Sequence, residues 1–95
     1  MKFKKLDNTF GEYMFYCPGC QEHHCVWTDK RDGVNPWQFN GDVDKPTISP
    51  SILVNKGHAN PNAHVCHSFI RDGKIQYLFD CTHSLAGQTV ELENI

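Results

Sequence analysis

The 95-residue chain carries nine Lys and Arg residues against eleven Asp and Glu residues, a formal net charge of −2. A balanced charge argues against a protein that binds nucleic acid mainly by neutralising phosphates. No apolar stretch approaches the roughly 20 residues that span a bilayer, and the segment MKFKKLDNTF lacks the apolar core of a signal peptide. We therefore expect a single domain, residues 1–95, in the cytoplasm.

Short strands, separated by Gly, Pro, Asn and Asp, account for nearly the whole sequence, and helical periodicity is almost absent. The predicted strands, in chain order, are residues 2–6, 12–16, 24–28, 37–40, 47–54, 64–70, 75–80 and 89–92. The segment NKGHANPNA, residues 55–63, has the composition of an exposed loop. The sum predicts an all-β fold, a small antiparallel sheet or sandwich.

The stretch TISPSILV alternates as a half-buried strand does. Ile48, Pro50, Ile52 and Val54 fall on one face, and the intervening serines fall on the other. Proline cannot donate to a sheet ladder, so Pro50 indicates that this strand is an edge strand or contains a bulge.

The clearest hairpin signal is Asp72-Gly73 between two apolar runs, which favours a two-residue type I′ turn. Such a turn pairs Arg71 with Lys74. Continuing that register places Cys66 and Cys81 on one face of the hairpin. His67 and Asp80 then lie on the opposite face.

Cys17-Pro18-Gly19-Cys20 is the strongest chemical motif. Two thiolates three positions apart in a tight turn can bind one tetrahedral metal, and five cysteines in a cytosolic chain indicate metal or redox chemistry. The alternative is a thioredoxin-like redox pair, but that motif begins a helix and no helix is predicted after Cys20. The motif therefore predicts a zinc (Zn2+) knuckle.

A knuckle needs two further ligands, and the later hairpin supplies candidates. The predicted set is Cys17, Cys20, Cys66 and Cys81, with His67, His83 and His64 as alternates. Cys66 and Cys81 can also be buried free thiols, because cysteine packs as a small apolar residue. His24 is a less favoured ligand, and Cys25 is predicted to be a core thiol.

Asp80 near His67 and His83 is the residue pattern of general acid–base chemistry or of groups that support a metal. If zinc had an open position, these three residues could act on its water, which would make the protein a zinc hydrolase. We favour the structural interpretation, in which Asp80 accepts backbone hydrogen bonds at the end of its strand. Stacking of single-stranded nucleic acid on Trp37 and Phe39 is a third hypothesis, and the acidic balance disfavours it.

Five segments together resemble a family of small zinc-binding proteins of tailed phages and prophages, a distant branch of which occurs beside bacterial ubiquitin-like conjugation genes. They are FYCPGC…HH, WQFNGD, PTISPSILV, CHSFIRDGKIQYL and DCTHSLAGQTVEL, and they cover residues 15–92. The resemblance implies metal ligands at Cys17 and Cys20, at Cys66 with His67, and at Cys81 and His83. It also implies a phage origin, and it implies no activity.

The sequence thus predicts a protein with a structural zinc site that acts by binding a host or phage protein, without contact to membranes or nucleic acid. The zinc hydrolase with an open metal position near His67, Asp80 and His83 is the alternative from a different functional class.

Overall fold

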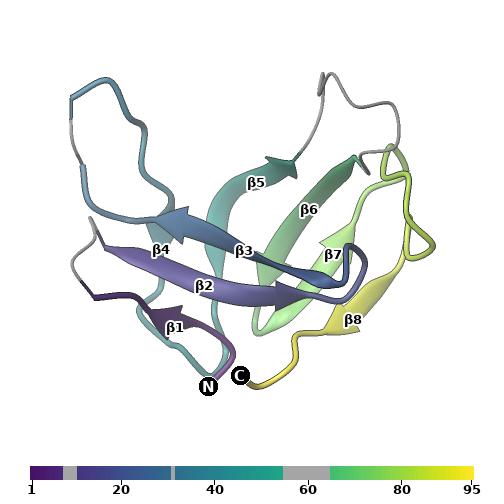
Figure 1. The fold of residues 1–95 in the computed structure, drawn as a ribbon, viewed down its shortest axis with the longest axis horizontal. Helices are drawn as coiled ribbons and strands as arrows, with labels where there is room; N and C mark the ends of the chain where they lie inside the picture. The colour runs from purple at the N-terminus through teal and green to yellow at the C-terminus, as the bar shows by residue number, and fades with distance from the viewer. Residues whose placement is uncertain (8–10, 31, 55–64) are drawn as a thin grey trace.

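The computed structural model describes residues 1–7, 11–30, 32–54 and 65–95. Within these ranges the chain forms two antiparallel sheets and no helix, which confirms the predicted all-β class (Figure 1). The strands are β1 (Lys4–Lys5), β2 (Glu12–Cys17), β3 (Glu22–Trp27), β4 (Gln38–Phe39), β5 (Ile48–Val54), β6 (Cys66–Arg71), β7 (Lys74–Tyr77) and β8 (Thr89–Glu91). The predicted loop 55–63 and His64 lie outside the described residues.

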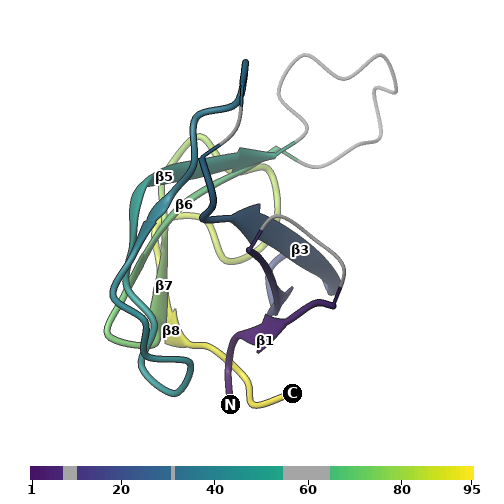
Figure 2. The same cartoon turned by 90° about the vertical axis from the view of Figure 1, so that its left-hand side faces the viewer.

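The first sheet has the order β1-β2-β3 and the second the order β4-β5-β6-β7-β8. Figure 2 shows the two sheets as facing layers, with β5 to β8 on one side and β1 and β3 on the other. The space between the layers holds the core, which is made of Phe3, Phe15, Val26, Ile48, Ile52, Ile70, Ile75, Tyr77, Leu92 and three cysteines, Cys17, Cys66 and Cys81.

The hairpin predicted at Asp72-Gly73 is confirmed, and a second hairpin precedes it in the chain. Strands β2 and β3 pair around the Cys17–Cys20 turn, with Cys17 opposite Glu22. Strands β6 and β7 pair with Arg71 opposite Lys74, the predicted register. Asp72 and Gly73 have φ angles of 50° and 75°, the two positive values that a type I′ turn requires.

Strand β5 contains a bulge, one of the two outcomes that Pro50 indicated. Ile48 pairs with Ile70 and Ile52 pairs with Ser68, so β5 advances four residues while β6 advances two. The two extra residues break the simple alternation predicted for this strand, and Pro50 is exposed. Bulges reorient side chains and recur beside active sites.

Candidate active site and metal-ligand cluster

Three polar side chains form a hydrogen-bonded chain on the outer face of the five-stranded sheet. Nε2 of His67 lies 3.0 Å from the hydroxyl of Ser51. Nδ1 of the same ring lies 3.0 Å from Oδ2 of Asp80. A hydroxyl, an imidazole and a carboxylate joined in this order through these two ring nitrogens have the geometry of a serine hydrolase triad.

Each triad residue comes from a different part of the sheet. Ser51 lies in the β5 bulge, between the pairs that flank it. His67 lies on the adjacent strand β6, opposite Leu53. Asp80 follows β7 in a turn closed by a hydrogen bond from the N–H of Cys81 to the carbonyl of Leu78, 3.2 Å long.

The backbone of His67 is fixed by Cys81. The N–H of His67 donates to Sγ of Cys81 at 3.2 Å, and the thiol in turn donates to the carbonyl of His67 at 3.2 Å. The N–H of Leu78 donates to the same carbonyl at 2.9 Å. These contacts hold the imidazole between its two partners, because they fix the backbone on both sides of its Cα.

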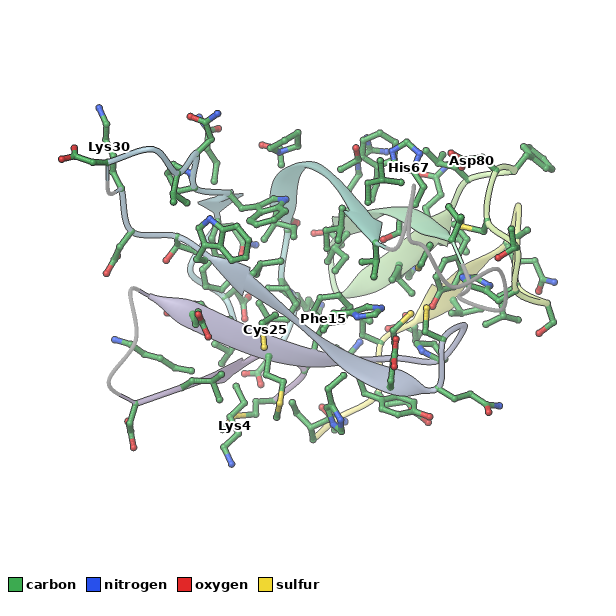
Figure 3. The ribbon with its side chains drawn as sticks, turned by 45° about the horizontal axis from the view of Figure 1, so that its top comes forward. Lys4, Phe15, Cys25, Lys30, His67 and Asp80 are labelled. Atoms are coloured by element: carbon green, nitrogen blue, oxygen red, sulfur yellow. The ribbon has the colours of Figure 1, made fainter. Side chains whose placement is uncertain are left out.

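The triad faces solvent. The side chains of His67 and Asp80 keep 25% and 48% of their accessible surface, and Figure 3 shows the two side by side, far from Lys4 and Cys25. A substrate can therefore reach the triad from outside the sandwich. The prediction that His67 and Asp80 share the hairpin face opposite Cys66 is confirmed by the burial of Cys66 in the core.

A second group of polar side chains lies between the sheets. One donor atom from each of Cys17, Cys20, His24 and Cys66 lies within 4.8 Å of all the others, so these residues can hold a metal ion. The sulfurs of Cys17 and Cys66 are 3.9 Å apart. Zinc–sulfur bonds of about 2.3 Å at tetrahedral angles would place two sulfurs about 3.8 Å apart, so this spacing fits zinc.

The ring of His24 has the properties expected of a metal ligand. Its Nε2 is buried and makes no hydrogen bond within the described part of the chain. A buried ring nitrogen without a partner costs free energy, and a metal ion among the three sulfurs would bind it. The spacing and chemistry of these four side chains thus fit a zinc site with three cysteine ligands and one histidine ligand.

The Cys17–Cys20 turn is held against the second sheet by Tyr77. Its hydroxyl accepts from the N–H of Gly19 at 2.9 Å and lies 3.1 Å from Sγ of Cys17. Gly19 touches the ring of His83 so closely that an added Cβ would lie 2.4 Å from it. Glycine is therefore needed here for close approach. Within the same turn, the N–H of Cys20 donates to Sγ of Cys17 at 3.5 Å.

The electrostatics of the cluster favour a cation. The hydrogen bond with Cys66 is the main cause that lowers the pKa of Cys17 to about 3, helped by Tyr77 and opposed by burial. Burial raises the pKa of Cys20 to about 12. The bond to Cys17 raises the pKa of Cys66. A bound cation would stabilise all three as thiolates.

The predicted ligands separate into two groups that share Cys66. Cys17, Cys20 and Cys66 come together as predicted, and His24 joins them. Cys81 instead lies with Cys66 and His83, in a second group within 4.8 Å. The alternate His64 lies outside the described residues, and the alternate His67 belongs to the triad.

The prediction that Cys25 is a core thiol is wrong. Cys25 is exposed, because its neighbour Val26 occupies the inward position on β3. Ser51 was not identified from the sequence at all. The only signal for it was Pro50, which indicated a bulge without showing which side chain the bulge would place beside His67.

Comparison with known proteins gives one family. Residues 2–78 match the model of the family described as bacterial ubiquitination-like system serine protease (BubE). The match includes Ser51 and His67 and ends two residues before Asp80. No curated protein and no solved structure matches the chain. No helix in the described ranges is long and apolar enough to cross a membrane. Because the match covers most of its residues, the chain belongs to the BubE family.

Proposed function

We propose that the protein is a serine protease whose nucleophile is Ser51, with His67 as general base and Asp80 as the group that orients His67. The observation that carries this proposal is the pair of 3.0 Å contacts that join the three side chains through opposite nitrogens of one imidazole. The description of the family as a serine protease supports it.

The geometry supports a two-step acyl transfer. Oγ of Ser51 attacks the carbonyl carbon of the peptide while Nε2 of His67 takes the hydroxyl proton. His67 then gives that proton to the leaving amine as the C–N bond breaks, and an ester to Ser51 remains. Water, deprotonated by the same nitrogen, attacks the ester. The C–O bond to Ser51 then breaks, His67 returns the proton to Oγ, and the acid is released. Asp80 accepts from Nδ1–H throughout and stabilises the imidazolium.

The contacts of His67 favour serine chemistry over the zinc hydrolase alternative. Both ring nitrogens of His67 already contact polar partners, Ser51 and Asp80, which leaves neither free to bind a metal. Within the described ranges, neither potential metal-binding group includes His67 or Asp80.

We further propose that zinc binds Cys17, Cys20, His24 and Cys66 and has a structural role. Four protein ligands close a tetrahedral site and leave no position for water or substrate, as in structural zinc sites. Cys81 serves better as the anchor of the His67 backbone than as a ligand, because its sulfur already makes two hydrogen bonds.

The family description also supports a substrate class. It names a bacterial ubiquitination-like system, so we propose that the bond cleaved lies in a protein of such a system. The protein partner expected from the sequence would then be the substrate. The cytoplasmic location and the phage origin remain predictions.

The test uses a small serine-reactive probe, diisopropyl fluorophosphate, followed by mass spectrometry of the labelled peptide. The wild-type protein should form one adduct, on Ser51, and Ser51→Ala should form none while keeping its melting temperature. Ser49→Ala is the matched control, an exposed serine on the same strand, and should label as the wild type does. Labelling that persists in Ser51→Ala would refute the assignment.

A further inference from the structure

Among the described residues, strand β5 has a free edge beside the proposed nucleophile. Its partner β4 pairs only with Ile48 and Ser49. The chain before β4 turns away toward the other sheet, where the N–H of Trp37 donates to the carbonyl of Trp27 at 2.9 Å. From Ser51 to Val54, β5 therefore has a strand partner on the β6 side only, as far as the described residues go (Figure 1).

A free edge presents unpaired backbone N–H and C=O groups, which can pair with an extended peptide. Here the edge begins at the residue that attacks the scissile carbonyl. A peptide whose carbonyl lies beside Ser51 can extend along this edge, whereas the other edge of β5 is already paired with β6. The edge is thus continuous with the proposed active site.

Exposed apolar side chains mark the same region. The described part of the chain exposes four large hydrophobic residues, and two of them, Met1 and Ile95, are terminal. The other two flank the triad. Leu53 is 47% exposed and lies opposite His67, and Phe79 is 90% exposed and precedes Asp80. Exposed apolar residues gathered at a catalytic site indicate contact with apolar groups of a substrate.

We propose that the edge of β5 from Ser51 to Val54 binds the substrate chain as an added antiparallel strand, and that Leu53 contacts an apolar substrate side chain. Side chains two residues apart share a face of a strand. In antiparallel pairing, the contacted residue therefore lies two positions N-terminal to the residue beside Ser51. This inference rests on the proposed protease function and adds to it a preference for an apolar residue in the substrate.

The experiment measures inactivation of the full chain by acetyl-tripeptide diphenyl phosphonates, in which Ser51 Oγ displaces phenoxide from phosphorus. The residue two positions before the phosphonate-bearing one is Leu, Gly or Lys. The wild type should react about tenfold faster with the Leu peptide than with the Gly peptide, a typical worth for an apolar contact. Methylation of the amide nitrogen of that Leu should slow the reaction, because strand addition depends on main-chain hydrogen bonds.

Leu53→Asp should reverse the preference, so that the Lys peptide reacts faster than the Leu peptide. Leu53→Ser should abolish the preference for Leu without creating one for Lys. Ile95→Asp is the matched control, because Ile95 is also an exposed apolar residue, and its preference should equal that of the wild type.

Diisopropyl fluorophosphate separates the two possible failures, because it needs the triad and not the edge. If it labels Ser51 in every variant at the wild-type rate while the peptide preference is unchanged by either Leu53 substitution, the edge proposal is overturned and the protease function stands. If it fails to label the wild type, both proposals fall.

Discussion

Cys66 and His67 are adjacent in β6 and face opposite sides of the same sheet. Cys66 is buried and lies 3.9 Å from Cys17 in the cluster between the sheets, whereas His67 contacts Ser51 and Asp80 on the outer face. The alternation of a β-strand thus places a proposed metal ligand and the proposed catalytic base on opposite faces of one strand. Any change that shifts β6 at the cluster should also move the imidazole.

Asp80→Asn should lower kcat strongly while the fold is retained. An amide can donate to Nδ1 of His67, which favours the tautomer that cannot accept the proton of Ser51. By analogy with other serine hydrolase triads, we expect a loss of up to about 10⁴-fold. Rates of ester hydrolysis and of phosphonate inactivation measure it, with circular dichroism as the control. An unchanged rate would remove Asp80 from the mechanism.

His24→Ala and Cys81→Ala should separate metal binding from activity. His24→Ala should weaken zinc binding by on the order of 100-fold or more, because even residues behind the ligands cost 10–100-fold. Cys81→Ala should keep one zinc per chain and lose activity, since it removes both contacts between the thiol and the His67 backbone. Elemental analysis and absorption at the zinc edge report the metal. Loss of zinc from Cys81→Ala alone would restore the four-cysteine set predicted from the sequence.

Gly19→Ala should destabilise the protein. The new methyl group would lie 2.4 Å from the ring of His83, and overpacking of this kind costs about 1–3 kcal/mol. Urea unfolding measures the loss. His83→Ala in the same chain should relieve much of it, because the double variant removes the ring that the methyl group meets. If the loss of stability in the double variant equals the sum of the losses in the two single variants, the two residues are not in contact as described.

The metal-free protein should lose stability as the pH rises above about 9. Folding raises the pKa of Cys20 from 9.0 to about 12 and raises those of Cys66 and Tyr77, for which burial and the bond to Cys17 are responsible. A group whose pKa is raised in the folded state stabilises that state fully below its unfolded pKa. This contribution is lost as the pH rises from the unfolded pKa to the folded pKa. Melting temperatures from pH 8 to 11 should fall less for zinc-loaded protein, whose thiolates are already formed.

The strands and the hairpin register could be predicted because they depend on local patterns. The Asp72-Gly73 turn predicted the pairing of Arg71 with Lys74, and hence that His67 and Asp80 share one face of the hairpin. Cys17 and Cys20 could be predicted as metal ligands for the same reason, because the two cysteines share one turn.

The remainder of both sites depends on the register in which paired strands align. His24 joins the cysteines because β3 returns beside β2, with His24 opposite Phe15. Ser51 reaches His67 because of two extra residues in β5. Neither a spacing rule nor alternation shows which histidine or serine such packing will select.

The two extra residues of β5 also offer a way to recognise inactive relatives by chain length. A family member that lacks them between the positions of Ile48 and Ile52 would pair β5 with β6 without interruption. Such a chain would keep the sandwich and the cluster between its sheets, but its hydroxyl would no longer lie beside the imidazole. We expect members of this kind to fold as this chain does and to lack protease activity.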